Sequence, residues 1–376
     1  MLLAQGLIQH AVPVTLITLT PRDSMDDDKL PFPVVRQPGF VKLFKLLRQA
    51  EVIHLAGPSL LPLWLAILLR KPVVIEHHGY QAICPSGLLL YEPTKTVCPG
   101  HFMAREYMQC VRCNRPNSGW VKSLVQLLLT FPRRWACKLA RTNVPISHHV
   151  ENRLRLPRSR VIYYGIPDAH EPADRAATTD GAGGRSGPPV FSYVGRLVTE
   201  KGIPVLLQSA KVLVDAGYAF HVKIIGDGPE RAKLEKMAHS LGLDGHVNFL
   251  GSLTGGPLRN ELKTAAAVVM PSVWEETAGL VAIEQMMHRG LVIAADIGGL
   301  GEVVGEAGQK FAPGDVVGLA ACLRRVLDDP GLAKFLADKG RERARELFSQ
   351  ERMVEDYLGV YHQIAGSFRR ASLRSL

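Results

Sequence analysis

The sequence lacks several features that would assign it to common classes of protein. Its longest apolar stretch, residues 60–69, contains Pro62 and ends at Arg70, whereas a membrane-spanning helix needs about 18 to 20 consecutive apolar residues. The chain opens with Met-Leu-Leu-Ala-Gln-Gly-Leu and lacks the basic leader and small-residue cleavage site of a secretory signal. It also lacks helix-turn-helix, zinc-finger and aromatic stacking motifs. We therefore expect a cytoplasmic protein without a membrane span and with no nucleic-acid partner.

The composition is ordinary, but the charge is unevenly distributed. A chain of 376 residues exceeds what one hydrophobic core usually organises, so we expect two domains. Residues 1–168 hold 21 Lys and Arg against 10 Asp and Glu, a balance of +11, while the remainder holds 24 against 25, a balance of −1. The basic first half indicates an anionic partner on that side, such as a membrane surface or a phosphate-bearing acceptor.

The stretch 271–284, Pro-Ser-Val-Trp-Glu-Glu-Thr-Ala-Gly-Leu-Val-Ala-Ile-Glu, carries the strongest chemical signal. Its pattern predicts a turn after a buried strand, followed by a helix that begins near Ala278 or Gly279. We expect Glu276 on the loop before the helix and Glu284 about a turn and a half inside it. Both carboxylates would then contact one elongated ligand that lies across the helix start.

The start of that predicted helix has the features of a phosphate site. Free N–H groups and the positive end of the helix dipole attract phosphate, and a glycine lets the backbone come close to it. We expect the amides of Gly279 and Leu280 to face a ligand with a diphosphate in its middle and hydroxyls at both ends. The plain alternative is that Glu276 merely favours a helix N-terminus and that Glu284 is a solvated helix residue.

A second motif, Gly-Arg-Leu-Val-Thr-Glu-Lys-Gly at residues 195–202, follows an apolar strand predicted at 190–194. Arg196 and Lys201 lie five positions apart on this glycine-bounded loop at the carboxyl end of a strand. There they are well placed to bind a diphosphate, the arginine bidentately and the lysine as a point charge. A pair of solvated surface cations is the alternative.

Together these motifs resemble those of the retaining glycosyltransferases of family four, also called group 1 glycosyltransferases. The resemblance is carried by Glu-x7-Glu after Pro-Ser at 271–284 and by Gly-Arg-x4-Lys-Gly at 195–202. It implies the GT-B fold, an α/β architecture of two Rossmann-like doubly wound parallel-sheet domains that face a cleft. It also implies transfer of a hexose-type sugar from a nucleoside-diphosphate sugar to a hydroxyl of a polysaccharide, lipid-linked or other glycan acceptor. No cofactor would be required for catalysis.

The resemblance assigns roles to the matching residues. Arg196 and Lys201 would stabilise the leaving nucleotide diphosphate. Glu276 would hold hydroxyls of the donor sugar, and Glu284 would hold the ribose hydroxyls. Glycine turns at the same sheet edge would border the donor, and these comprise Gly195, Gly226, Gly228, Gly298 and Gly299. No nucleophile is assigned, because the family is thought to react on one face, with the leaving phosphate taking the acceptor's proton.

In the first half, a histidine matches the family. The strand predicted at 72–76 runs into His-His-Gly-Tyr at residues 77–80. A histidine at the carboxyl end of a parallel strand lies where α/β sheets place their ligands. The family's matching position implies that His78 contacts the transferring sugar. His77 is the alternative, and a structural role for either histidine is the plain interpretation.

Residues 81–119 form a long segment without clear periodicity, which is usually functional or disordered at this length. Four of the six cysteines lie in it, namely Cys84, Cys98, Cys110 and Cys113. The two residues between the last pair suit a metal knuckle, because both thiolates can bind one tetrahedral ion. A structural zinc ion is therefore one expectation. Reduced thiols, disulfides and an iron–sulfur cluster are the alternatives.

A leucine-rich stretch at 120–141 is interrupted by Pro132 and contains several cations. These are Lys122, Arg133, Arg134, Lys138 and Arg141. An interfacial amphipathic element would combine these residue types and would make the protein peripheral on the inner face of the membrane. Two ordinary buried helices with basic ends are the alternative.

Strand–helix alternation across residues 41–76 predicts a parallel sheet with helices on both faces in the first half. We expect a short strand at 142–145, a helix that Ser147 caps, and a last strand at 160–163. The family usually has Asn-Gly after that strand, whereas this chain has Tyr-Gly, beginning at Tyr164.

We expect four parts along the chain. Residues 1–167 form the acceptor-side domain, and residues 168–188, rich in Ala, Asp, Gly and Pro, form a linker. Residues 189–349 form the nucleotide-sugar-binding domain. By resemblance, residues 350–376 form a helix that returns to pack on the first domain.

The first domain departs from the family at its start. A Rossmann half normally opens with a hydrophobic strand and a glycine-rich turn, and both are missing before the helix that ends near His10. Such a strand is central in its sheet, so its loss would leave backbone groups unpaired. We expect that the true start lies upstream or that the chain is truncated. Two rival functions stay open: a non-catalytic nucleotide-sugar-binding protein and a nucleotide-sugar epimerase of the same fold.

Overall fold

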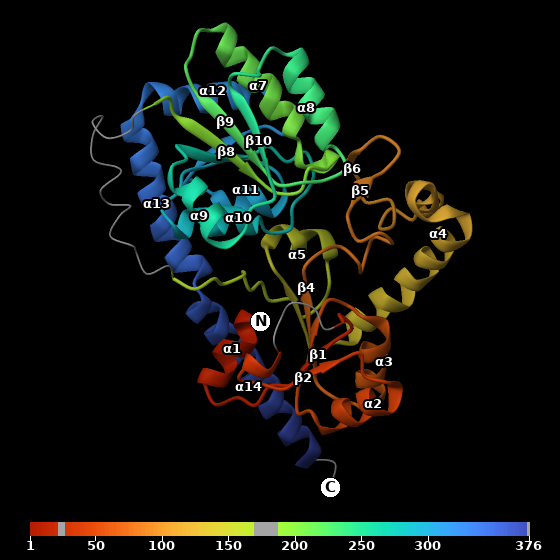
Figure 1. The fold of residues 1–376 in the computed structure, drawn as a ribbon. Helices are drawn as coiled ribbons and strands as arrows, with labels where there is room; N and C mark the ends of the chain where they lie inside the picture. Colours follow the sequence, from red (N-terminus) through yellow and green to blue (C-terminus); the bar gives the residue numbers. More distant parts are fainter. Residues whose placement is uncertain (22–26, 169–186, 374–376) are drawn as a thin grey trace. The chain divides into compact units, whose positions relative to one another are not determined.

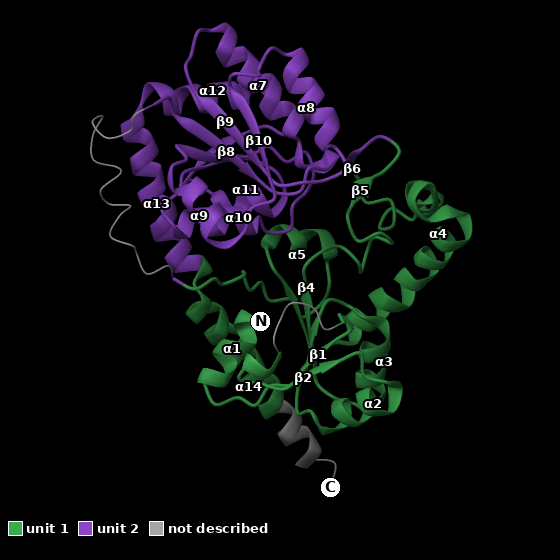
Figure 2. Cartoon of the chain, in the orientation of Figure 1, with its two compact units in different colours: residues 1–93, 98–167, 348–376 green, residues 94–97, 168–347 purple. Residues whose placement is uncertain are grey.

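The computed structural model describes residues 1–21, 27–168 and 187–373, with side chains up to residue 366. The chain divides into two compact units (Figure 2). The first unit comprises residues 1–93, 98–167 and 348–376, and the second comprises residues 94–97 and 168–347. Most of the predicted linker, residues 169–186, lies outside the described residues.

The second unit is built on a six-stranded parallel sheet in the order β10-β9-β8-β11-β12-β13. Its strands are β8 (Val190–Val194), β9 (His221–Ile225), β10 (Val247–Gly251), β11 (Ala267–Met270), β12 (Val292–Ala295) and β13 (Gln309–Phe311). Counted from β8 along the chain, this is the 3-2-1-4-5-6 order of dinucleotide-binding sheets. The strand order reverses between β8 and β11, which is the point where such sheets bind ligands outside the carboxyl ends of their strands.

Helices cover both faces of this sheet (Figure 1). They are η3 (Thr199–Lys201), α7 (Ile203–Asp215), α8 (Arg231–Ser240), α9 (Gly255–Lys263), α10 (Leu280–Met287), α11 (Gly298–Val304), α12 (Val316–Asp328) and α13 (Pro330–Phe348). Side chains alternate between the two faces along β11. Ala267 and Val269 belong to the large core with α7, α8 and α12, while Val268 packs with α9 and α10. The second unit is therefore doubly wound, as predicted.

The first unit contains a three-stranded parallel sheet in the order β3-β4-β7, and β1 and β2 pair in parallel with each other. Its strands are β1 (Leu16–Thr18), β2 (Val34–Arg36), β3 (Ile53–Ala56), β4 (Val73–His77), β5 (Leu90–Tyr91) and β7 (Thr142–Pro145). The short strand β6 (Thr96–Val97) follows β5 in the sequence but belongs to the second unit. The helices of the first unit are α1 (Leu2–Gln9), η1 (Asp27–Lys29), α2 (Phe40–Gln49), α3 (Leu60–Leu68), α4 (Tyr107–Leu139), α5 (His148–Leu154) and α14 (Gln350–Leu373). The prediction of an α/β fold with parallel sheets is confirmed. Ser147 caps α5 as expected, because its hydroxyl accepts the N–H of Val150 at 3.2 Å.

Two predictions for the first unit are wrong. Residues 160–163 do not form a strand. They run beside β7 with backbone hydrogen bonds from Arg160 to Asn143 and from Ile162 to Pro145, but Ile162 packs into a cluster with α14. The other error concerns α4, whose first part begins at Tyr107 inside the segment expected to be aperiodic. The helical backbone breaks at Gly119 (φ 70°, ψ 173°), at the predicted boundary before the leucine-rich stretch, and the second part continues through Pro132.

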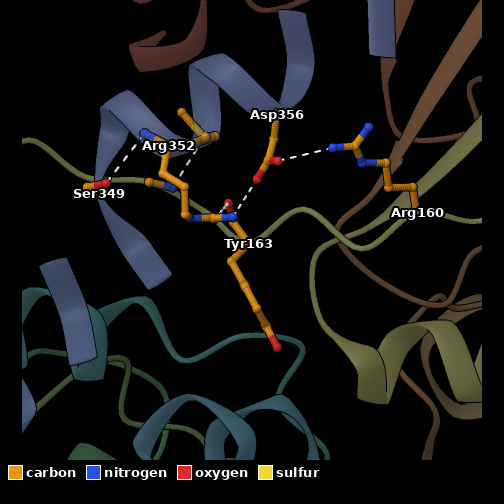
Figure 3. A network of polar contacts seen from close by, with 7 residues as sticks. Arg160, Tyr163, Ser349, Arg352 and Asp356 are labelled. Atoms are coloured by element: carbon orange, nitrogen blue, oxygen red, sulfur yellow. Dashed lines mark hydrogen bonds and ion pairs between the residues drawn. The ribbon is translucent and has the colours of Figure 1, made fainter. Parts of the chain in front are cut away.

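The last helix, α14, packs on the first unit. Val74 of β4, Val144 of β7 and Tyr357 of α14 share one buried cluster. Polar contacts add to this packing: Asp356 accepts a hydrogen bond from Arg160 at 3.1 Å, and the Arg352 side chain donates to the backbone oxygen of Tyr163 at 3.3 Å (Figure 3). The returning helix thus completes the first unit.

Candidate functional site

In the second unit, the loops after β8 and β9 touch through their backbones. A Cβ atom on Gly226 would lie 1.9 Å from the carbonyl oxygen of Gly195, and one on Gly228 would lie 2.4 Å from that of Leu197. The N–H of Gly195 donates to the oxygen of Ile225 at 3.0 Å. Only glycine permits such close approach, so Gly226 and Gly228 allow the two loops to pack directly against each other.

Equally close contact joins the two motifs that carry the chemical prediction. Gly202 has a left-handed φ of +67°, and a Cβ atom there would lie 1.9 Å from the carbonyl oxygen of Pro271. The N–H of Val273 donates to the oxygen of Glu200 at 3.1 Å. The loop 195–202 after β8 and the loop after β11 therefore meet at the switch point of the sheet.

Their side chains meet as well. Lys201 Nζ lies 2.8 Å from Glu276 Oε1, and the side chains are only 19% and 9% exposed. The Ser272 hydroxyl donates a short hydrogen bond to the same carboxylate oxygen. A buried carboxylate is costly unless it is paired and hydrogen-bonded, and here it is both. The structure thus brings together two of the residues that the sequence nominated, and it adds Ser272, to which the sequence assigned no role.

The loop after β12 closes around the other side of Glu276. The N–H of Gly299 donates to the backbone oxygen of Glu276 at 2.6 Å, and a Cβ atom on Gly298 would lie 2.5 Å from that oxygen. Gly298 and Gly299 begin the short helix α11 instead of forming the predicted turn. Their small size still serves the expected purpose, because it lets this helix start against the Glu276 backbone.

Arg196 is arranged differently from Lys201. Its side chain is 74% exposed, and its Nη2 atom lies 3.9 Å from Glu200 Oε1. Its backbone oxygen accepts the Tyr193 hydroxyl at 2.8 Å, which holds the loop while leaving the guanidinium in solvent. Arg196 is thus on the correct loop, but it is not part of the Lys201–Glu276 pair.

The helix start predicted near Ala278 or Gly279 is confirmed. Gly279 is the N-cap of α10 with φ +74°, and Leu280 is its first residue. As a glycine, the N-cap residue has no side chain to cap this helix start, and it is buried against Leu300, while Leu280 is exposed. Glu284 lies on the solvent-facing side of α10, where partial desolvation raises the pKa of its carboxyl group.

In the first unit, the two histidines have separate environments. His77 is the last residue of β4 and is fully buried, with Nε2 2.9 Å from Asn143 Oδ1. Burial lowers the pKa of His77 to about 4, so it is neutral. His78 is one-third exposed and stacks on Tyr164, with ring centroids 5.4 Å apart. The accessible ring is therefore that of His78, the residue nominated for sugar contact.

Glu76 supports this histidine, although the sequence analysis gave it no role. Its Oε2 atom lies 3.3 Å from His54 Nε2 and 3.4 Å from His78 Nε2. Burial by itself raises the pKa of Glu76, but the His54 hydrogen bond and the neighbouring imidazoles outweigh burial and hold this pKa below its usual value. A carboxylate inside the apolar run Val-Val-Ile-Glu was the available signal for such a role.

The four nominated cysteines lie around one small cavity in the first unit. Its lining residues are Cys84, Pro85, Leu90, Cys98, His101, Cys110, Cys113 and Asn114. All four thiols are buried and free of disulfides. Burial, together with the other three thiols, raises the pKa of Cys110 to about 12. Within the described ranges, no three cysteine, histidine or carboxylate side chains are already arranged as metal ligands.

Comparison with known proteins finds a matching protein family. Residues 177–343 match the family model for glycosyl transferases group 1. The 2-deoxystreptamine glucosyltransferase of Streptomyces kanamyceticus is 31% identical over 281 residues, which cover 70% of this chain and 72% of that protein. The glycogen synthase of Mycobacterium tuberculosis is 31% identical over 253 residues, which cover 65% of this chain and 59% of that protein. This chain therefore spans less than two thirds of the latter relative.

Solved structures of glycosyltransferases share the fold. The sucrose-phosphate synthase from Thermosynechococcus elongatus superposes with a TM-score of 0.70 at 23% identity, covering 97% of this chain and 92% of that chain. HepE from Anabaena, in complex with UDP and glucose, superposes with a TM-score of 0.67 at 18% identity, covering 96% and 93%. At these identities the likeness shows the fold alone, which is the GT-B arrangement of two Rossmann-like domains.

Proposed function

This chain belongs to the group 1 glycosyl transferase family, and on that premise we propose that it is a retaining glycosyltransferase that uses a nucleoside-diphosphate hexose. The observation that carries the proposal is the meeting of three loops at the switch point of the second unit. Lys201 follows β8, Glu276 follows β11, and the glycines that begin α11 follow β12. Such an edge is where open α/β sheets bind nucleotides.

The donor diphosphate would occupy the cationic part of this edge. Lys201 is paired with Glu276, which orients the ammonium group before the donor arrives. Arg196 extends from the same loop into solvent and is free to turn toward a phosphate. The uncapped start of α10 offers N–H groups from Gly279 and Leu280. These groups neutralise a leaving diphosphate without requiring a metal ion.

In the proposed reaction, a hydroxyl oxygen of the acceptor attacks the anomeric carbon of the donor sugar. The bond from that carbon to the diphosphate oxygen breaks on the same face, and the leaving phosphate accepts the hydroxyl proton. Glu276 would hold sugar hydroxyls, with its charge balanced by Lys201 and its orientation set by Ser272. Glu284 would accept hydrogen bonds from the ribose, and His78 would contact the transferred sugar.

The acceptor side would face a membrane. Large apolar side chains are exposed along one stretch of α4, namely Trp120, Val121, Leu124, Val125, Leu128, Leu129, Phe131, Trp135 and Leu139. Four cations lie on the same stretch, Lys122, Arg133, Arg134 and Lys138. Such a helix binds an anionic lipid surface through apolar burial and charge together. No helix in the described part of the chain is both long and apolar enough to span a bilayer. We propose a glycan or lipid-linked acceptor presented at that surface.

The proposal is tested by transfer itself. Purified protein is incubated with radiolabelled nucleotide sugars, beginning with UDP-glucose, and with a bacterial membrane extract that supplies acceptors. Label is expected in the acceptor fraction without any added divalent metal ion. Binding of a donor without transfer would instead indicate a non-catalytic binder. Interconversion of free donor without an acceptor would indicate an epimerase.

A further inference from the structure

The cysteine cavity of the first unit is not used by the proposed reaction. Cys84 follows β4, Cys98 lies in the connection after β6, and Cys110 and Cys113 lie near the start of α4. These positions span thirty residues of the chain, yet all four side chains line one cavity. Each residue is between 6% and 8% exposed. A segment with little regular structure has thus buried four thiols together.

Two features of this cavity are those of a metal site. Backbone amides point at two of the sulfurs: the N–H of Gly100 lies 3.5 Å from Cys98 Sγ, and that of Glu92 lies 3.4 Å from Cys113 Sγ. Second-shell hydrogen bonds of this kind orient metal ligands in structural sites. Cys110 and Cys113 are three residues apart at the first turns of α4, so they share a helix face at its positive end.

Four thiols suffice for a tetrahedral site, so a fifth ligand is not needed. His101 also lines the cavity; its Nδ1 atom is 2.5 Å from Glu106 Oε2, and its ring packs edge-on against Tyr91. The thiols are not yet gathered around one point. Rotation about χ1 moves a cysteine sulfur between three staggered positions without moving the backbone, so the shared cavity matters more than the present rotamers.

We propose that Cys84, Cys98, Cys110 and Cys113 bind one structural zinc ion as thiolates. Four sulfur ligands select zinc or an iron–sulfur cluster, and a cavity this small fits a single ion. Each thiol releases its proton to solvent on binding, and no redox change occurs. The ion would join the end of β4, the connection after β6 and the start of α4. It would thereby shape residues 81–119 beside the strand end that carries His78.

The experiment measures metal content in full-length protein purified without added metal or affinity tags that bind metal. Elemental analysis is expected to find about one zinc per chain. The single variants Cys110→Ser and Cys113→Ser should lose it. Cys137→Ser and Cys322→Ser are matched controls, because both remove a buried cysteine outside the cavity, and they should keep the metal.

A second measurement keeps the proposal testable if the serine variants misfold. Wild-type protein is stripped with a chelator under reducing conditions and titrated with Co²⁺. A thiolate-to-cobalt charge-transfer band that saturates at one equivalent and disappears on adding Zn²⁺ is expected. Absence of zinc as purified together with absence of the cobalt band would overturn the proposal. A disulfide among the four cysteines, or an iron chromophore in place of zinc, would also overturn it.

Discussion

The two units hold their ligand-side residues by different means. In the second unit, backbone contacts fix the loops, since Gly202 and Gly226 each leave no room for a Cβ atom. In the first unit, the end of β4 is held by side chains: His78 stacks on Tyr164 and lies beside Glu76. A site fixed by backbone tolerates little change in residue type. A site held by side chains can be altered by substitution without moving the backbone.

The largest effect should follow from removing the lysine of the backbone-held site. Lys201→Ala is expected to lower kcat/KM for transfer by roughly 100- to 1,000-fold, the usual cost of losing one group that stabilises developing charge. Lys223→Ala is the matched control, because Lys223 of β9 pairs with Glu261 of α9 at 2.6 Å in the same unit but away from these loops.

Lys201→Ala also leaves the buried Glu276 carboxylate without its ion-pair partner, which by itself destabilises the fold. The double variant Lys201→Ala/Glu276→Gln removes that charge and should be folded but equally inactive. Circular dichroism reports the fold, and the labelled-donor assay reports transfer. A rate near that of the wild type in either variant would exclude the role given to Lys201.

The second effect concerns the stability of the backbone contacts. Gly202→Ala should lower the free energy of unfolding of the second unit by more than Gly217→Ala does. Both glycines have left-handed φ, +67° and +79°, so both substitutions incur about 1 kcal/mol of backbone strain. Only at Gly202 would the new Cβ atom also collide with Pro271, whereas at Gly217 it would meet nothing within 4 Å. Equal losses in calorimetry would show that the loop contact is not specific.

A third effect tests the exposed face of α4. The triple variant Val121→Ser/Leu124→Ser/Leu128→Ser should weaken binding to anionic vesicles by at least tenfold, because each side chain contributes roughly 1 kcal/mol or more on burial in lipid. Val317→Ser, an equally exposed apolar position in the second unit, should bind as the wild type does. Co-sedimentation at two salt concentrations separates the charge contribution. Unchanged sedimentation of the triple variant would contradict the proposed contact of α4 with a membrane surface.

The smallest effect contrasts two carboxyl groups whose pKa values move in opposite directions. The pKa of Glu76 is lowered, so its ionised form adds stability above the usual carboxyl range, and this is lost as pH falls through the folded-state pKa. The pKa of Glu284 is raised, so its ionised form costs stability at neutral pH, and the cost disappears as pH falls through its folded-state pKa.

Glu76→Gln should therefore lower Tm at neutral pH and do so less in acid. Glu284→Gln should raise Tm slightly at neutral pH. Calorimetry across this range measures both. Parallel pH profiles for the two variants would contradict the opposite environments.

The placement of the nominated residues of the second unit could be predicted from the sequence because each lies on a loop directly after a predicted strand. Arg196 and Lys201 lie on a loop that directly follows β8, and Glu276 lies on one that follows β11. Parallel strands bring their carboxyl ends to one edge, which predicts that both loops lie on the same side of the sheet. The pairing of Lys201 with Glu276 follows from the adjacency of β8 and β11, which the structure shows. The bond from Ser272 was not foreseeable, since many hydroxyls sit beside such loops.

The first unit was less predictable because long-range contacts decide its structure. Residues 160–163 follow β7 through only a few backbone hydrogen bonds, and Ile162 packs in a cluster with β4, β7 and α14, which lies almost two hundred residues later. Pro132 indicated a break, but α4 continues past it, and the helical backbone breaks at Gly119 instead. The stacking of Tyr164 on His78 also depends on a fold that the strand pattern does not specify.

The most direct test of the central claim is nucleotide binding at the loops that meet beside Lys201. Isothermal titration calorimetry compares UDP, GDP and ADP on wild-type protein, Lys201→Ala and Lys223→Ala. We expect at least one of these diphosphates to bind the wild type and Lys223→Ala equally, and to bind Lys201→Ala about tenfold more weakly, a difference of about 1.4 kcal/mol. Equal affinity for Lys201→Ala, or no binding of any diphosphate to the wild type, would contradict the claim.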